Sequence, residues 1–268
     1  MKLCLQWNSI PTASDINAKL DFLETHGFAA VEIPSGDWPL KNAEALRDAI
    51  AKRPLKVAAC CGPSDFSHAE PERREAEVAK MLPVIEAIAH VGSTGLIICP
   101  ARSTVAMGFA ELRKDFVENT GKRMAQHAAK HGTKILLEPL RRNETPFLRQ
   151  VADGARMAHE IGEGAAVMGD FWHMAGEEFS LPRAFEYAGD LLAHIHIAGL
   201  RERIIPGVPG VSDDDYAESF RALRNMNYAG VISYEGGWPA CGWDNDAIGP
   251  DEKKRLILQM AEYLRKQW

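Results

Sequence analysis

The chain contains 268 residues, 46% of them hydrophobic, which is enough to fill the core of one large α/β domain without disulfides. Its formal net charge of −6 argues against nucleic acid as a partner, because phosphate binding requires a positive surface. No window approaches the roughly 20 apolar residues of a membrane span, the N-terminus lacks a signal-peptide pattern, and the five cysteines show no CxxC spacing. We therefore expect a cytoplasmic protein without a membrane partner.

Short apolar runs alternate with longer segments of helical periodicity along the whole chain. The runs that we predict to be strands cover residues 2–7, 30–33, 55–60, 95–99, 134–138, 166–170, 193–198 and 230–235. Helical spacing is clear at Ile16, Leu20 and Leu23. Alternating strands and helices predict a parallel sheet, and a helix after the eighth strand favours closure into a barrel. The predicted fold is therefore a (β/α)8 TIM barrel, with one domain spanning residues 1–268.

Four of the predicted strands end in side chains that can bind metals or transfer protons. These are Glu138, Asp170, His196 and Glu235, on the fifth to eighth strands. Apolar residues occupy the alternate positions of these strands, so the four polar side chains share the face that points into the barrel. In α/β barrels the C-terminal ends of the strands carry the active site. The sequence therefore predicts that these side chains meet at one mouth of the barrel.

Three carboxylates that converge would repel one another, and their burial would raise their pKa values unless a cation compensated them. One divalent metal resolves this conflict. Three oxygen donors and one imidazole, with no thiolate, suit Mn²⁺, with Mg²⁺ or Co²⁺ as alternatives, better than a structural zinc. A single carboxylate at a strand end is more often an ion-pair partner, and we favour that role for Glu32, which ends the second strand.

Four segments resemble the corresponding blocks of the xylose isomerase-like barrel superfamily. They are ILLEPLRRNETPFL, GDFWHMAGEE, HIHIAGLRERIIPG and YAGVISYEGGW, in this order between residues 134 and 238. The nearest group within the superfamily contains the ketose 3-epimerases and the hydroxypyruvate isomerases. The resemblance implies a metal-dependent enzyme that acts on a small sugar or keto-sugar. It also implies that the four strand-end residues are the metal ligands.

The resemblance further assigns catalytic and substrate-binding roles. Glu138 and Glu235 would form the acid/base pair that removes a proton next to a carbonyl, through an enediolate, and returns it. His173, Glu144 and Arg203 match positions that bind substrate. Without the family match, His173 would be interpreted as a satisfied buried histidine. The chain also departs from the family pattern, because an arginine, the first of the pair in PLRRNE, stands where epimerases often carry asparagine.

Other interpretations stay open at this level. A lyase that resembles the inosose dehydratases would form the same enediolate and then lose a hydroxyl group, and no sequence feature separates it from an epimerase. A non-catalytic sugar-binding barrel would leave the paired glutamates without a purpose. A zinc endonuclease on the same scaffold would need more metal ligands and a basic groove. The resemblance allows a homo-oligomer, either a dimer or a tetramer.

Overall fold

Eight parallel strands close into a barrel in chain order, with β1 paired to β8. The computed structural model describes residues 1–12, 15–62, 65–102 and 105–268. The strands are β1 (Leu3–Gln6), β2 (Ala30–Ile33), β3 (Lys56–Gly62), β4 (Gly95–Ile98), β5 (Lys134–Leu137), β6 (Ala165–Asp170), β7 (Leu192–Ile197) and β8 (Ile232–Tyr234). All eight predicted strands are present, so the predicted TIM barrel is confirmed.

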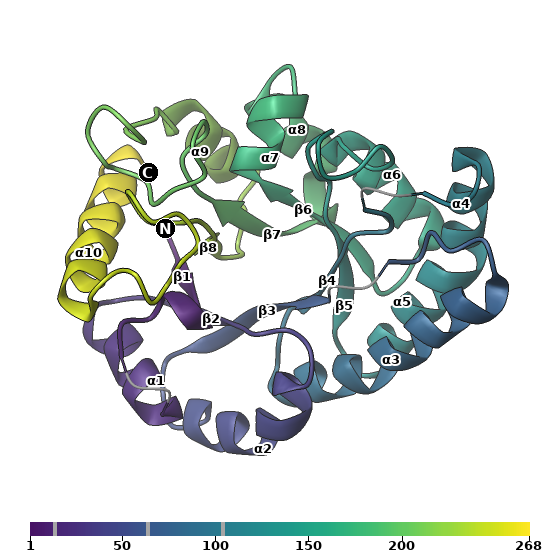
Figure 1. The fold of residues 1–268 in the computed structure, drawn as a ribbon, viewed down its shortest axis with the longest axis horizontal. Helices are drawn as coiled ribbons and strands as arrows, with labels where there is room; N and C mark the ends of the chain where they lie inside the picture. Colours follow the sequence, from purple (N-terminus) through teal and green to yellow (C-terminus); the bar gives the residue numbers. More distant parts are fainter. Residues whose placement is uncertain (13–14, 63–64, 103–104) are drawn as a thin grey trace.

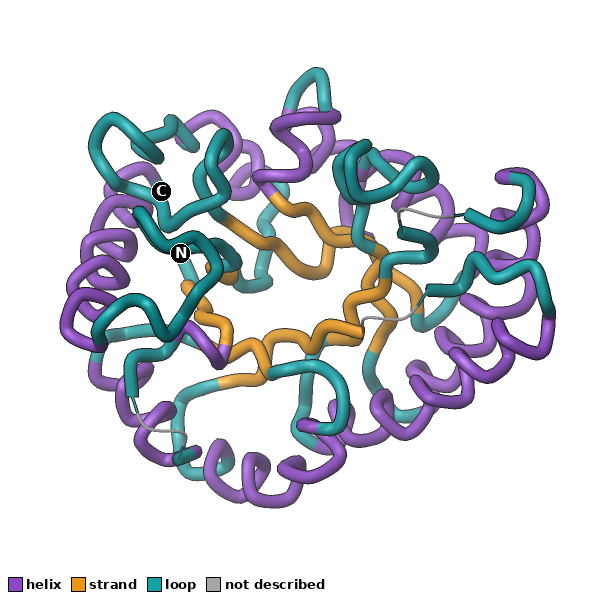
Figure 2. Tube along the Cα trace, in the orientation of Figure 1, coloured by secondary structure: helices purple, strands orange, loops and turns teal. Residues whose placement is uncertain are grey.

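Helices surround this ring of strands, and loops gather over the face that Figures 1 and 2 turn toward the viewer. The helices are α1 (Ile16–Thr25), α2 (Trp38–Ile50), α3 (Pro71–His90), α4 (Phe109–Asp115), α5 (Gly121–Lys130), α6 (Val151–Ile161), α7 (Phe171–Glu177), α8 (Leu181–Ala188), α9 (Ala217–Asn225) and α10 (Pro250–Gln267). Three short helical segments complete the order: η1 (Trp7–Ser9), η2 (Phe116–Thr120) and η3 (Gly189–Leu191). Among the described residues, no helix combines the length and the apolar character that crossing a membrane requires.

Local sequence signals explain where several helices begin and end. The Asp15 side chain accepts a hydrogen bond of 2.8 Å from the backbone N–H of Ala18 and thereby caps α1. Gly27, Gly92 and Gly132 follow the ends of α1, α3 and α5 with φ between 70° and 75°. This left-handed conformation strains residues that carry a Cβ atom, so glycine ends each helix at little cost.

The end of β3 differs from the sequence prediction. The strand was expected to stop at Cys60, but it runs on to Gly62, with Cys61 paired to Ile97. A Cβ atom on Gly62 would lie 3.0 Å from the carbonyl oxygen of Ile97, so glycine permits the close approach of β4. The longer strand carries Cys61 to the mouth of the barrel.

Two small apolar clusters lie apart from the main core. One consists of Cys4, Ala30 and Ala58, and the other consists of Ala59, Ile97, Leu136, Ala166 and Met168. The outward faces of the strands join the helices in a much larger apolar core. Side chains able to bind a metal ion stand at the C-terminal mouth, where the ends of the strands meet.

Candidate active site and metal centre

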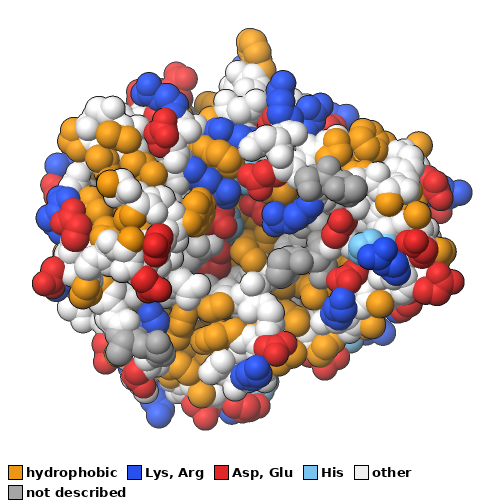
Figure 3. Space-filling view, in the orientation of Figure 1, with side chains coloured by type: hydrophobic (Ala, Val, Ile, Leu, Met, Phe, Trp, Pro, Cys, Tyr) orange, Lys and Arg blue, Asp and Glu red, His pale blue; other side chains and the backbone are white. Residues whose placement is uncertain are grey.

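The four predicted ligands converge at the C-terminal mouth of the barrel. Glu138 directly follows β5 and Glu235 directly follows β8, while Asp170 ends β6 and His196 lies within β7. One ligand atom from each residue lies within 4.8 Å of the others. Backbone hydrogen bonds to the neighbouring strands hold both glutamates, from Glu138 N to Ile98 O (3.0 Å) and from Glu235 N to Ile197 O (3.2 Å). In Figure 3 the centre of this face is hollowed, and acidic side chains line the hollow.

The two carboxylate oxygens of Asp170 have different partners. Oδ1 accepts hydrogen bonds from the backbone N–H groups of Trp172 (2.7 Å) and His173 (3.4 Å), which caps α7. Oδ2 lies 2.8 Å from Nη2 of Arg203 and faces the site. The helix cap thus fixes the direction in which the second oxygen is offered to a ligand.

Glu32 fixes the orientation of His196. Its Oε2 lies 2.9 Å from Nε2 of His196 and 2.9 Å from Nε2 of His194. Burial opposes ionisation of Glu32, but the two histidines outweigh it and hold the pKa of Glu32 well below its usual range. An ionised carboxylate can only accept, so both Nε2 atoms carry protons and His196 presents Nδ1 to the site. The ion pair predicted for Glu32 is confirmed.

The buried Nδ1 atom of His196 faces two of the carboxylates. It lies 2.9 Å from Oε2 of Glu235 and 3.8 Å from Oε1 of Glu138. It has no hydrogen-bond partner of good geometry among the described residues. Burial lowers the pKa of His196, but Glu32 and Glu235 raise it well above its usual range in the protein alone. One imidazole nitrogen and three carboxylates directed at one point fit a divalent cation, because such a cation would satisfy all four.

Arg203 supplies positive charge inside the ligand cluster. Its Nη2 lies 2.8 Å from Oδ2 of Asp170 and 2.6 Å from Oε2 of Glu235, and its guanidinium stacks over Trp172. Burial lowers the pKa of Arg203, but the carboxylates around it raise it above its usual value. The resemblance assigns Arg203 to substrate binding, and these contacts place it at the site, whereas the side chain of the nearby Arg201 is exposed. The charge argument made from the sequence considered three carboxylates and one metal ion, and it did not include the positive charge of Arg203.

His173 and Glu144 lie beside the ligands. Both line a cavity of 220 Å³ together with Cys61, Gly62, Ile97, Cys99, Arg102, Glu138, Leu140, Arg203 and Glu235. The backbone N–H of Arg141 donates to Nδ1 of His173 (3.0 Å), so the neutral ring carries its proton on Nε2. That nitrogen lies 3.6 Å from Oδ2 of Asp170. His173 therefore presents a hydrogen-bond donor near the ligands, while Glu144 approaches Arg203 to 3.9 Å.

Sequence reasoning missed two cysteines and one arginine at this site. Cys99 Sγ donates to Oε2 of Glu138 at 3.4 Å, and burial together with Glu138 raises the pKa of this thiol well above its usual value. Cys61 and Arg102 line the same cavity. Cys99 was already visible as the last residue of the predicted fourth strand, where its position matched that of the four ligands.

The eight-stranded barrel gathers at its C-terminal mouth side chains that could bind a metal ion or transfer protons, which is the architecture of TIM-barrel enzymes. Residues 20–267 match the model of one family, the xylose isomerase-like TIM barrel, and the chain belongs to that family. The chain is 30% identical over 233 residues to the 3-dehydro-D-guloside 4-epimerase of Escherichia coli K12, covering 83% of this chain and 87% of that protein.

Two further comparisons agree with this result. The chain is 26% identical over 239 residues to the L-ribulose 3-epimerase of Methylomonas sp. DH-1, covering 86% of this chain and 82% of that protein. The crystal structure of the 3-keto-D-glucoside 4-epimerase of E. coli superposes with a TM-score of 0.79 at 29% identity, covering 96% and 99% of the two chains. All three are epimerases, which does not favour the lyase alternative.

Proposed function

We propose that the protein is a metal-dependent epimerase that inverts a carbon next to the carbonyl group of a keto-sugar. The observation that carries this proposal is the position of Glu138 and Glu235, which approach Nδ1 of the same histidine from two strands. The relatives' names describe the same chemistry: a 3-dehydro-sugar is inverted at C4, and a 2-ketose at C3. In both cases the inverted carbon neighbours the carbonyl, where the proton is acidic enough for a carboxylate to remove.

Glu138 and Glu235 act as the acid/base pair in this proposal. Burial raises the pKa of Glu235, but His196 and Arg203 outweigh it and hold the pKa below its usual range, so this group is an ionised base at neutral pH. The Cys99 thiol donates to Glu138 and holds one of its oxygens in place. One glutamate removes the proton from one face of the substrate carbon, and the other delivers a proton to the opposite face. This sequence inverts the centre.

The remaining residues bind the substrate. His173 donates from Nε2 to a sugar hydroxyl, Glu144 accepts from one, and Arg203 donates to an oxygen near the ligands. Glu138, Asp170, His196 and Glu235 hold one divalent cation, which supplies Lewis-acid stabilisation of negative charge on the substrate oxygens. Mn²⁺ suits three oxygen donors and one nitrogen donor, with Mg²⁺ or Co²⁺ as substitutes.

The similarity to the E. coli protein favours a glycoside over a free ketose as substrate. That relative is the more similar of the two over a comparable share of the chain. Glucose and gulose differ at C3 and C4, and oxidation at C3 removes one of these centres. Inversion at C4 therefore converts a 3-dehydro-guloside into a 3-dehydro-glucoside, and we propose this reaction class for the chain.

Deuterium exchange tests the proposal. The Mn²⁺-loaded protein is incubated in heavy water with methyl 3-dehydro-β-D-glucopyranoside and, separately, with D-ribulose, and both mixtures are followed by NMR. We expect deuterium at C4 of the glycoside together with the appearance of its C4 epimer, and slower labelling at C3 of ribulose. Loss of water from either sugar would instead indicate a lyase. Neither label nor conversion, with metal binding verified, would overturn the proposal.

A further inference from the structure

Two further cavities lie next to the cavity at the metal ligands, along the mouth of the barrel. The cavity at the ligands shares Cys61 with a cavity of 170 Å³ at the ends of β1 and β2. That cavity shares Trp7 and Asn8 with a third cavity of 730 Å³. The 220 Å³ beside the ligands is less than a ligand site typically offers, whereas the outer cavity lies well within the usual range. The three neighbouring cavities, which we call the groove, together have room for a molecule longer than one sugar ring.

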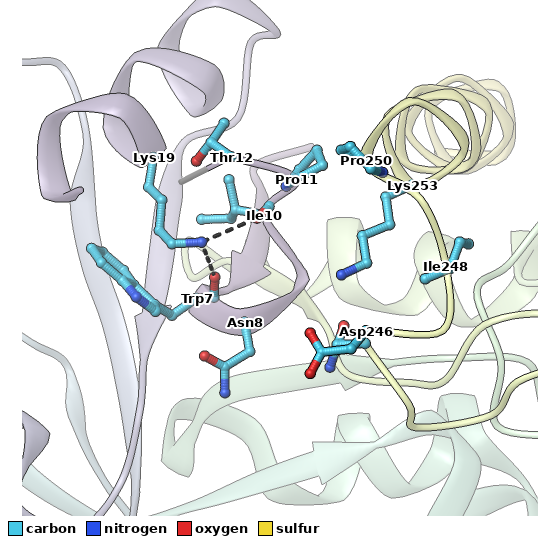
Figure 4. A pocket seen from close by; sticks show the side chains of 11 residues that line it. Trp7, Asn8, Ile10, Pro11, Thr12, Lys19, Asp246, Ile248, Pro250 and Lys253 are labelled. Carbon is cyan, nitrogen blue, oxygen red and sulfur yellow. Dashed lines mark hydrogen bonds between the residues drawn. The ribbon is translucent and has the colours of Figure 1, made fainter. Parts of the chain in front are cut away.

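Two lysines from distant parts of the chain lie at the outer cavity. Lys19 lies in the first turn of α1 and Lys253 lies in the first turn of α10. Both line this cavity, and Figure 4 shows the ammonium group of Lys253 directed into the space between the segment that follows β1 and the start of α10, while that of Lys19 is directed at the carbonyl oxygens of the same segment. Lys19 is 5% exposed and Lys253 is 9% exposed. Burial to this degree is rare for lysine unless the charge has a partner.

Only one of the two lysines has hydrogen-bond partners within the described chain. Nζ of Lys19 donates to the carbonyl oxygens of Trp7 (3.1 Å) and Ile10 (3.0 Å). Nζ of Lys253 lies 5.7 Å from the ring centroid of Trp238, and within the described part of the chain it forms no hydrogen bond or ion pair at contact distance. Asp246 also lines the cavity, and its charge raises the pKa of Lys253, but burial lowers that pKa more. Two lysines and one carboxylate therefore line the cavity, which leaves it with an excess of positive charge.

The lysines also repel each other. Burial, followed by the charge of Lys253, lowers the pKa of Lys19 to about 8. Two ammonium groups and one carboxylate face the cavity, and the amides of Asn8 and Asn245 add neutral hydrogen-bond donors. A bound anion would relieve this repulsion and give Lys253 an acceptor at hydrogen-bond distance.

We propose that the outer cavity is a subsite for an anionic group, a carboxylate or a phosphate, carried by the aglycone of the glycoside substrate. This inference rests on the proposed function, because it places the keto-sugar at the metal ligands and the rest of the same molecule along the groove. The anion pairs with Lys253 and accepts from the third proton of Lys19. The subsite selects substrates by charge and takes no part in the proton transfer.

Binding measurements with matched glycosides test the subsite independently of turnover. The probes are phenyl β-D-glucopyranoside and two analogues that carry a carboxylate or a phosphate at position 4 of the phenyl ring. They are titrated into Mn²⁺-loaded protein by calorimetry. The variants are Lys253→Met and, as a matched control, Lys254→Met, which alters the exposed neighbouring lysine. Lys19 is left intact because it supports the backbone of the segment after β1.

We expect the anionic probes to bind the unchanged protein about tenfold or more tightly than the phenyl glycoside. Lys253→Met removes this preference and leaves the phenyl glycoside unaffected, while Lys254→Met changes neither. The anion that binds more tightly identifies the source. Equal binding of neutral and anionic probes to the unchanged protein, or a preference that survives Lys253→Met, overturns the subsite.

The 3-dehydro forms of the same glycosides separate this proposal from the proposed function. If all three are epimerised at equal kcat/KM, the epimerase is correct and the subsite is wrong. If the anionic probes bind through Lys253 but no glycoside is epimerised, the subsite stands and the epimerase is wrong. If no probe binds and none is converted, both proposals fail.

Discussion

Two groups of one glutamate and two histidines lie in different regions of the molecule. Glu32, His194 and His196 are inside the barrel, whereas Glu86, His127 and His131 lie on the outer surface between α3 and α5. The shortest contacts are the same, since each glutamate lies 2.9 Å from a histidine Nε2. Their surroundings differ, because the inner side chains are at most 1% exposed and the outer ones are 22% to 52% exposed.

This difference shows why distances alone do not identify a metal centre. In the inner group, strand pairing and one carboxylate fix both rings, and His196 directs its free nitrogen at further carboxylates. In the outer group, water competes for every polar atom, and binding a cation would first have to order mobile side chains. The comparison predicts that the inner group contributes to tight metal binding and that the outer group does not.

Removal of the metal gives the largest expected effect. We expect a chelator to abolish epimerisation and Mn²⁺ or Co²⁺ to restore it, with one metal ion bound per chain, as measured by turnover and by elemental analysis. Full activity of the metal-free protein would contradict the assignment. A second tightly bound ion that is lost in the His127→Gln variant would show that the outer group also binds metal, contrary to this comparison.

Substitution of either proposed acid/base residue comes next. Glu138→Gln and Glu235→Gln should each lower kcat by about 10²-fold or more, the scale of a positioned acid or base. Neither side chain belongs to the apolar clusters of the core, so the folded state should persist, as circular dichroism can verify. Glu86→Gln serves as the control on the outer surface. Near-normal turnover in either Glu138→Gln or Glu235→Gln would refute the two-base mechanism.

Glu32→Gln tests the link between orientation and metal affinity. Glutamine keeps one acceptor oxygen but loses the charge that fixes both rings, so we expect Mn²⁺ to bind about 10–100-fold more weakly. Calorimetric titration of Mn²⁺ measures this change, and Glu86→Gln should leave the affinity unchanged. Unaltered Mn²⁺ affinity in Glu32→Gln would show that the strand alone orients His196.

The smallest effect is expected at the outer group itself. His131 is 40% exposed in its side chain, and its nitrogen lies 4.0 Å from Glu86. His131→Gln should change the free energy of unfolding by no more than about 0.5 kcal/mol in urea denaturation. A loss of several times this size would show that the outer group stabilises the packing of α3 on α5.

The sequence predicted the barrel and its ligand cluster because both follow from local patterns joined by one topological rule. Alternation within a strand decides which side chains face inward, and closure of a parallel barrel brings the strand ends together. These two rules alone predicted that four side chains would converge: Glu138, Asp170, His196 and Glu235. The boundary of β3 was wrong because Gly62 suggests an end when the chain is examined alone, and only its approach to β4 explains the glycine.

Contacts made by loops escaped prediction for a physical reason. Arg203 reaches Asp170 and Glu235 from the segment after β7, and the path of that segment depends on packing against distant residues. The outer cavity likewise forms where residues 7–12 meet residues 245–253. The periodicity of a sequence does not predict contacts between loops that lie far apart in the chain. The same limit hid the double role of Glu32, whose two histidine partners lie more than 160 positions away.

The double use of Asp170 also restricts how the chain can vary in length. Asp170 ends β6 and caps α7, so no spare residue separates the barrel wall from the helix that carries His173. An insertion of one residue at this junction would turn His173 by about 100° around the helix axis, away from the ligand cluster. The segment between β7 and α9 is longer, and the part of it that follows Arg203 can absorb added residues. Substrate range can therefore change through the β7 loop, while the β6 junction must keep its length.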